Sequence, residues 1–277
     1  MNNTKINTFI AGLLSLTMPL GAFVVTSGCE YKPISELSAE DGIVRLRELN
    51  QEESWERLIQ EINEYRSRFP YSQYAAEADL MQANAYFKTS RHPEAIASYD
   101  DFLRRNPSHK QADLALFRVA KSYDAQSPEE PEREQATTQK AVDKYAELIE
   151  RFPNSEHAAE SKERSASLRQ RVADHHLFIG NFYWKKSLYH AALNRYLLIL
   201  NRFSDLSEIR MAALDRASES YLKLAEELER NPNSDAVSYF RSQTPAQLKE
   251  RSAELAKKKQ DLLGTTPKSK ASEVSEG

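Results

Sequence analysis

The chain is poor in the residues that build disulfides, sheets and membrane spans. It has one cysteine and 7 glycines in 277 residues, and its formal net charge at pH 7 is −3. A single cysteine excludes an intramolecular disulfide, and so small a net charge predicts no nucleic-acid binding. No run of alternating β-branched residues indicates a sheet. From Glu30 onward no segment has an apolar run close to the length of about 18 residues that a membrane span requires.

What the chain does contain is one spacing that occurs four times. Apolar or small residues recur at steps of four and then three, and a proline or a serine follows five residues later. These steps place the side chains on one face of a helix, which the proline then ends because it lacks a backbone donor. Each occurrence therefore predicts a short helix with one buried stripe. The four sets are Leu58, Ile62, Tyr65 and Pro70; Ala95, Tyr99, Phe102 and Pro107; Ala141, Tyr145, Leu148 and Pro153; and Ala192, Tyr196, Ile199 and Ser204.

A second signature precedes these stripes. A small residue lies twelve positions before the stripe, and an aromatic residue follows it three positions later; the third copy carries nine extra residues. The pairs are Ala83 and Tyr86, Ala120 and Tyr123, and Gly180 and Tyr183, with Leu46 and Leu49 at the same places in the first copy. A small side chain lets two antiparallel helices approach closely, so each unit is predicted to be a helix pair.

Helix pairs in series resemble the tetratricopeptide repeat, whose period is about 34 residues. We expect an all-α solenoid of about five helix pairs from Asp41 to Leu263, the fifth pair starting near Ala217 and Tyr221. The proline-bearing, acidic segment Gln126 to Thr138 predicts an exposed loop. Extra residues after Pro153 predict a long helix from His157 to Trp184. That helix would join two groups of repeats, at 41–155 and 156–263, with a disordered tail at 264–277.

The N-terminus predicts a lipid anchor. The stretch Phe9 to Val25 is apolar enough for the core of a signal peptide, which would be residues 1–28. Small residues then precede Cys29, as in the bacterial lipobox, although Thr26 holds the place where leucine is usual. A diacylglycerol and an N-acyl chain on Cys29 would hold the protein on a bilayer, with 29–40 as a linker, and no other cofactor is expected.

Several short sequence segments together resemble those of the BamD family, the tetratricopeptide lipoproteins of the outer-membrane β-barrel assembly (BAM) machinery. They are Arg68 to Tyr74, Arg105 to His109 and Arg151 to Ser155, which follow the first three stripes. The resemblance implies a non-enzymatic scaffold, lipid-anchored on the periplasmic face of the outer membrane. Its implied partners are the periplasmic domains of BamA, other BAM lipoproteins and unfolded outer-membrane proteins. An Asn-Arg pair of the family, in the second helix of the fourth repeat, corresponds to Asn194 and Arg195.

The residues themselves predict a peptide groove. One position after the small residue, three consecutive repeats carry Arg47, Asn84 and Lys121, which could hold the backbone or terminal carboxylate of an extended peptide. The alternative is that they are ordinary solvated side chains on an exposed helix face. The residues expected to receive an aromatic side chain are Leu80 and Phe87 on the same face and Tyr71 and Tyr74 at the rim.

We find no catalytic motif and no metal-ligand spacing in the sequence. His175 and His176 are adjacent, so on a helix they diverge by about 100° and cannot share one metal. The sequence has no glycine-rich phosphate loop. Two other functions remain open: a different lipidated repeat adaptor, such as a secretin pilotin or a coordinator of cell-wall synthesis, and a regulator of a periplasmic hydrolase or a cryptic enzyme.

Overall fold

The computed structural model describes residues 32–233 and 242–265. Within these ranges the chain forms a short 3-10 helix and ten α-helices and contains no strand, so the prediction of an all-α fold is confirmed. The elements are η1 Ile34–Glu36, α1 Ala39–Gln51, α2 Trp55–Arg68, α3 Ala75–Lys88, α4 His92–Arg105, α5 Ala112–Ala125, α6 Ala136–Arg151, α7 Ala158–Lys185, α8 Tyr189–Arg202, α9 Ser207–Arg230 and α10 Pro245–Thr265. None of them is both long enough and apolar enough to cross a membrane.

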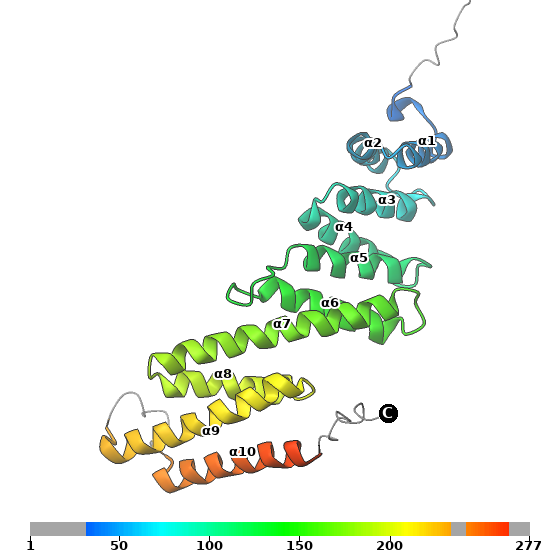
Figure 1. Ribbon diagram of the computed structural model, residues 1–277. Helices are drawn as coiled ribbons and strands as arrows, with labels where there is room; N and C mark the ends of the chain where they lie inside the picture. The colour runs from blue at the N-terminus through cyan, green and yellow to red at the C-terminus, as the bar shows by residue number, and fades with distance from the viewer. Residues whose placement is uncertain (1–31, 234–241, 266–277) are drawn as a thin grey trace, which may run out of the picture.

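The helices form a stack of antiparallel pairs in chain order. Each α-helix packs against the helices before and after it in the sequence, and Figure 1 shows the pairs following one another from α1 and α2 to α9 and α10. Stacked pairs bury apolar surface mainly against their neighbours, which is the architecture of a tetratricopeptide solenoid. The five described pairs agree with the number that the sequence predicted.

The predicted stripes are the centre of this stack. All twelve of their apolar residues have an exposed fraction of 0%. The helices that carry them end at Arg68, Arg105, Arg151 and Arg202, two residues before the residues expected to stop them. The predicted helix register is therefore confirmed in all four copies.

Two of the stripe tyrosines pack closely against a glycine of the partner helix. A methyl group added to Gly180 would lie 2.6 Å from Tyr196 Cε1, and one added to Gly42 would lie 2.9 Å from the Tyr65 ring. Both are closer than carbon atoms in contact can approach. The glycines thus permit an approach of α7 to α8, and of α1 to α2, that a larger residue would block.

The hydroxyls of these buried tyrosines all have dedicated acceptors. Tyr99 donates to Asn84 Oδ1 at 2.5 Å, Tyr145 to Asp124 Oδ2 at 3.2 Å, and Tyr196 to Asn181 Oδ1 at 2.9 Å. Tyr65 donates to the Ala39 carbonyl at 3.1 Å. Burial raises the pKa of Tyr196 to about 12, so its hydroxyl stays protonated and keeps donating. A buried hydroxyl without an acceptor would cost about 1–3 kcal/mol.

The turns inside three pairs are also equivalent. Glu53, Ser90 and Ser187 have positive φ values of 56°, 58° and 58°, and each lies five residues before its stripe. The next backbone N–H donates to a carbonyl five residues earlier, as Arg91 N does to Tyr86 O. This is the Schellman ending of a helix. The third pair, between α5 and α6, has the inserted loop instead.

The long helix α7 confirms the predicted connector between two groups of repeats. Leu168 belongs to the apolar core that α3 to α6 form, whereas Val172, one turn later, belongs to the core of α8 to α10. The inserted loop is 126–135, shorter than expected because α6 begins at Ala136. Arg171 donates to the Pro128 carbonyl at 3.1 Å, and His175 Nδ1 to the Pro131 carbonyl at 2.6 Å. The loop is therefore docked on α7 where the two cores meet.

The contact between Gly180 and Tyr196 gives a stability prediction. We expect Gly180→Ala to lower the free energy of unfolding by about 1–3 kcal/mol, because the added methyl group overpacks the pair. Urea unfolding followed by circular dichroism measures this change.

Gly264→Ala is the matched control, since a methyl group there meets nothing within 4 Å. It should leave stability unchanged or raise it slightly, as alanine favours helix more than glycine does. Equal stability of Gly180→Ala and the wild type would contradict the close approach of α7 and α8.

Candidate functional site

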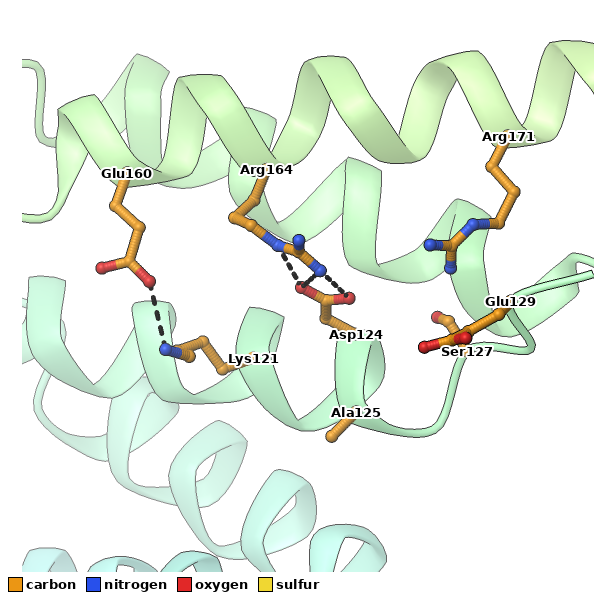
Figure 2. Close-up of a pocket in the computed structure, with 8 residues that line it drawn as sticks. All are labelled: Lys121, Asp124, Ala125, Ser127, Glu129, Glu160, Arg164 and Arg171. Atoms are coloured by element: carbon orange, nitrogen blue, oxygen red, sulfur yellow. Dashed lines mark hydrogen bonds and ion pairs between the residues drawn. The ribbon is translucent and has the colours of Figure 1, made fainter.

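A polar cleft lies between the first helices of the third and fourth pairs. It has a volume of about 490 Å³ and opens between α5, the 126–135 loop and α7. Figure 2 shows side chains from the two helices pointing toward each other across it. The lining residues are Lys121, Asp124, Ala125, Ser127, Glu129, Glu160, Arg164 and Arg171.

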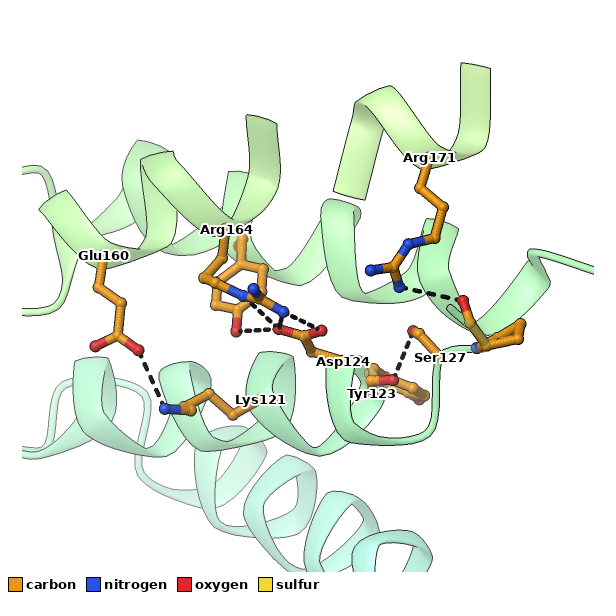
Figure 3. A network of polar contacts seen from close by, with 9 residues as sticks. Lys121, Tyr123, Asp124, Ser127, Glu160, Arg164 and Arg171 are labelled. Carbon is orange, nitrogen blue, oxygen red and sulfur yellow. Dashed lines mark hydrogen bonds and ion pairs between the residues drawn. The ribbon is translucent and has the colours of Figure 1, made fainter. Parts of the chain in front are cut away.

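Two ion pairs cross this cleft from α5 to α7. Lys121 Nζ lies 3.1 Å from Glu160 Oε1, and Arg164 donates to both oxygens of Asp124, at 2.9 and 2.8 Å. Asp124 also accepts from the buried hydroxyl of Tyr145, so one carboxylate connects three helices (Figure 3). Paired arginine and carboxylate groups of this kind are strong and directional, and they fix the third pair against the fourth.

Arg171 differs from the other two cations of the cleft. Its one partner is the Pro128 carbonyl, and across the described residues no carboxylate lies within ion-pair distance of it. Glu129, on the loop, also lines the cleft and is exposed. The cleft can therefore offer the Arg171 guanidinium, the Glu129 carboxylate and the Ser127 hydroxyl to a ligand. Among the described residues no group of three histidine, cysteine or acidic side chains could hold a metal ion.

The three predicted groove donors already have partners within the chain. Arg47 donates to both oxygens of Glu77 at 2.7 Å, Lys121 pairs with Glu160, and the Asn84 side-chain oxygen accepts from Tyr99. Arg47 and Lys121 are therefore occupied by acidic partners, whereas Asn84 keeps its NH₂ group as a donor, and peptide binding by the three stays a prediction. The ion pairs form because the first helices of successive pairs are close enough for charged side chains to connect them. Of the three, only Lys121 lines the cleft described above.

The residues expected to receive an aromatic side chain do not form one surface. Leu80 is only 5% exposed and belongs to the apolar core, which corrects the prediction that it lines a groove. Phe87 packs against the same core, with the Arg118 guanidinium 4.5 Å from its ring centre. Tyr74 is partly buried beneath Arg47, at 5.8 Å. Tyr71 alone is fully available, at 97% exposure.

Asn194 and Arg195 lie on α8, where Asn194 is exposed and Arg195 is partly buried. Arg195 Nη1 lies 3.4 Å from His176 Nδ1 on α7. Burial, together with the nearby charges of Arg195 and Arg202, lowers the pKa of His176 to about 4. The imidazole is therefore neutral near pH 7. No described carboxylate lies within ion-pair distance of Arg195.

The sequence reasoning missed His176, because it treated the histidine pair only as possible metal ligands. The signal was present: His176 lies four residues before Gly180, so both lie on the face of α7 that meets α8.

One protein family matches most of this helical stack. The family model of YfiO, described as an outer membrane lipoprotein, matches residues 46–236. This chain belongs to that family. The YfiO family match runs from the second half of α1 through the whole of α9, and so includes the cleft, Asn194 and Arg195. Cys29 lies outside the described residues, and its lipidation stays a prediction.

Two similar proteins share the name outer membrane protein assembly factor BamD. The outer membrane protein assembly factor BamD of Neisseria meningitidis serogroup B is 31% identical over 148 residues, which are 50% of this chain and 55% of that protein. The factor of the same name from Vibrio cholerae is 25% identical over 78% of this chain and 90% of that protein. The TPR2AB-domain:pHSP90 complex of yeast Sti1 is 12% identical over 82% of this chain and 92% of that one, with a TM-score of 0.40.

His176 gives a prediction of pH dependence. Its folded pKa of about 4 lies below the unfolded value of about 6.5, so between these values the unfolded chain binds a proton that the folded chain does not. The stabilisation is complete above pH 6.5 and is lost as the pH falls toward 4. His176→Gln removes the proton uptake, so its stability should fall less than that of the wild type over this range.

Urea unfolding at pH 7.0, 5.5 and 4.5 measures the difference. His190→Gln, at the start of α8, is the control and should follow the wild type. Parallel losses in the wild type and His176→Gln would contradict a neutral, buried imidazole beside Arg195.

Proposed function

We propose that this protein is a scaffold of outer-membrane protein assembly, tethered by acyl chains on Cys29 to the periplasmic face of the outer membrane. The observation that carries the proposal is the family match over residues 46–236, together with relatives named as assembly factors. A stack of helix pairs suits this role because it offers long, continuous surfaces to other polypeptides. Its chemistry is binding, and we assign it no catalytic step.

The proposed contact with the periplasmic domains of BamA is the surface of Asn194 and Arg195. Arg195 is held against neutral His176 and has no acidic partner in the described chain, so it can pair with a carboxylate of another protein. Exposed Asn194 can supply hydrogen bonds beside it. Partly buried arginines are frequent anchors of protein interfaces. The other BAM lipoproteins are proposed partners with no residues assigned.

The proposed contact with unfolded barrel proteins is the polar cleft between α5 and α7. Arg171 and Glu129 can bind charged side chains or backbone groups of an extended polypeptide, and Lys121 can exchange Glu160 for an incoming carboxylate. Arg47 would contribute only if it left Glu77, whereas Asn84 could donate through its NH₂ group while its oxygen keeps Tyr99. This places the substrate site next to the docked loop, at the junction of the two cores.

Arg195→Glu tests the partner contact. We expect the variant to lose at least about tenfold in the amount of BamA that co-purifies from detergent extracts, because it presents a negative charge to the carboxylate that Arg195 would bind. Quantitative mass spectrometry of the purified complexes measures this.

Arg104→Glu, at a more exposed arginine on α4 that pairs with Asp101, is the control and should retain BamA. Undiminished BamA with Arg195→Glu would exclude this surface as the contact. Absence of BamA from the wild-type preparation would contradict the proposed function itself.

Cys29→Ser tests the tether. Without the thiol no diacylglycerol can be attached, so the protein should move from the membrane fraction to the soluble periplasmic fraction. Fractionation with immunoblotting measures the shift, and metabolic labelling with a palmitate analogue should label only the wild type. A Cys29→Ser protein that stayed in the membrane fraction would show that another feature anchors the chain.

A further inference from the structure

An apolar surface is exposed at the C-terminal end of α7. Three large apolar side chains lie close together in sequence there, Phe178, Phe182 and Leu188, with exposed fractions of 43%, 49% and 43%. The two phenylalanines are four residues apart and therefore share one face of the helix. Figure 1 shows that this end of α7 extends past α6 to the edge of the stack. Leu188 follows in the turn to α8.

The docked loop covers only the first part of this face of α7. Arg171 and His175, which bind the loop carbonyls, precede Phe178 at steps of four and three residues. Side chains at these steps lie on one face of a helix. The loop therefore ends its contact with α7 at His175, and the face continues beyond it as two exposed phenylalanines.

The exposed apolar surface lies beside positive charge. No aspartate or glutamate occurs from His175 to Ser204, although the chain has 41 acidic residues. Lys185 and Lys186 are exposed, and among the described residues no carboxylate lies within ion-pair distance of either. Lys186 Nζ lies 5.9 Å from the ring centre of Phe182. We call the combined surface the α7 tip, which consists of Phe178, Phe182, Lys185, Lys186 and Leu188.

The equivalent turns of the first two pairs lack this combination. The three turns can be aligned by their positive-φ residues, Glu53, Ser90 and Ser187. At the places of Phe182, Lys186 and Leu188, the first pair has Glu48, Glu52 and Ser54, and the second has Ala85, Thr89 and Arg91. Because all three turns have the same helix ending, the turn itself does not require apolar and basic side chains. Binding of a ligand outside the stack gives a reason for them.

The composition of the α7 tip favours a lipid surface over another protein. Phenylalanine and leucine beside lysine are typical of segments that lie in a membrane interface, where apolar groups reach the acyl chains and lysine contacts phosphate. Lysine is depleted in protein interfaces. Trp184 and Tyr189 are partly buried at the same turn, with ring centres 5.0 Å apart, and these residue types are enriched at membrane–water interfaces.

We propose that the α7 tip binds the surface of a membrane that contains anionic phospholipids. The two phenylalanines and Leu188 contact the acyl chains below the headgroups, and Lys185 and Lys186 pair with the phosphodiester groups. With acyl chains on Cys29 as a second attachment, this contact would hold the stack along the membrane surface. The inference does not require that tether, and the experiment below omits it.

A fluorescent probe in the turn tests the contact. In the full-length Cys29→Ser protein, Ser187→Cys supplies the only thiol, and a nitrobenzoxadiazole dye on it reports a change from water to an apolar environment. Vesicles of phosphatidylethanolamine with about 30% phosphatidylglycerol should raise the dye emission about twofold and shift it to shorter wavelength.

Ser90→Cys is the matched control for the position of the dye. Ser90 is also exposed and has the same φ of 58° in the turn of the second pair, and a dye there should not respond to the vesicles. Because the dye reports its own surroundings, binding of the N-terminus to the vesicles does not produce the signal at position 187.

Charge reversal tests the role of the lysines. Lys185→Glu combined with Lys186→Glu should weaken vesicle binding, measured by titration of the dye emission, at least about tenfold. Lys257→Glu combined with Lys258→Glu changes the net charge equally at exposed sites of α10 and should leave binding unchanged. Vesicles of phosphatidylcholine alone should bind the unchanged tip about tenfold more weakly than the anionic vesicles.

Removal of an aromatic ring tests the apolar contact. Phe182→Ser should weaken binding to the anionic vesicles about tenfold, and circular dichroism verifies that the variant is folded. Tyr71→Ser is the control, because it removes an aromatic side chain that is 97% exposed outside the α7 tip, and it should bind as the unchanged protein does.

No response of the dye at position 187 to anionic vesicles, or an equal response at position 90, would overturn the proposal. Equal affinity for phosphatidylcholine and anionic vesicles would also overturn it, because the lysines would then have no part in binding. If no vesicle binds and the lysine reversal instead removes BamA from the purified complex, the α7 tip is a protein contact and the proposal is wrong.

Discussion

The packing of a buried tyrosine against a small residue determines the rest of this structure. In the fourth pair the Tyr196 ring occupies the space where a side chain at Gly180 would be, and its hydroxyl needs Asn181 as an acceptor. In the first pair Tyr65 meets Gly42 in the same way, and in each of the three earlier pairs the buried tyrosine has its own acceptor. This packing fixes the distance and the rotation of each pair, and because neighbouring pairs share their apolar faces, it also fixes the stack.

The polar residues between pairs depend on that fixed spacing. Asp124 can accept from Tyr145 of its own pair and from Arg164 of the next because α5, α6 and α7 are already held at contact distance. The docking of the 126–135 loop on Arg171 and His175 adds a second connection at the place where the two cores meet. The proposed binding surfaces therefore lie on rigid helices, which limits the entropy that is lost when a partner binds.

Helix register could be predicted from the sequence, and side-chain partners could not. A stripe at steps of four and three depends on local geometry alone, so every stripe residue was placed correctly. Asn84 was predicted to face a groove, yet its oxygen binds Tyr99, a choice that depends on the distance between two helices. For the same reason Leu80 was placed wrongly and the role of His176 was missed. Asp79 pairs with Arg66 and Arg105 from two other helices, and no single segment reveals this cluster.

The central proposal is that this helical stack binds BamA through its C-terminal repeats. A photo-crosslinking amino acid at exposed Asn194, activated in intact cells and followed by mass spectrometry of the adducts, tests it most directly. The account predicts that the main adduct is a periplasmic domain of BamA, and that the same probe at position 104 on α4 gives no such adduct. Adducts with other proteins and none with BamA would contradict it.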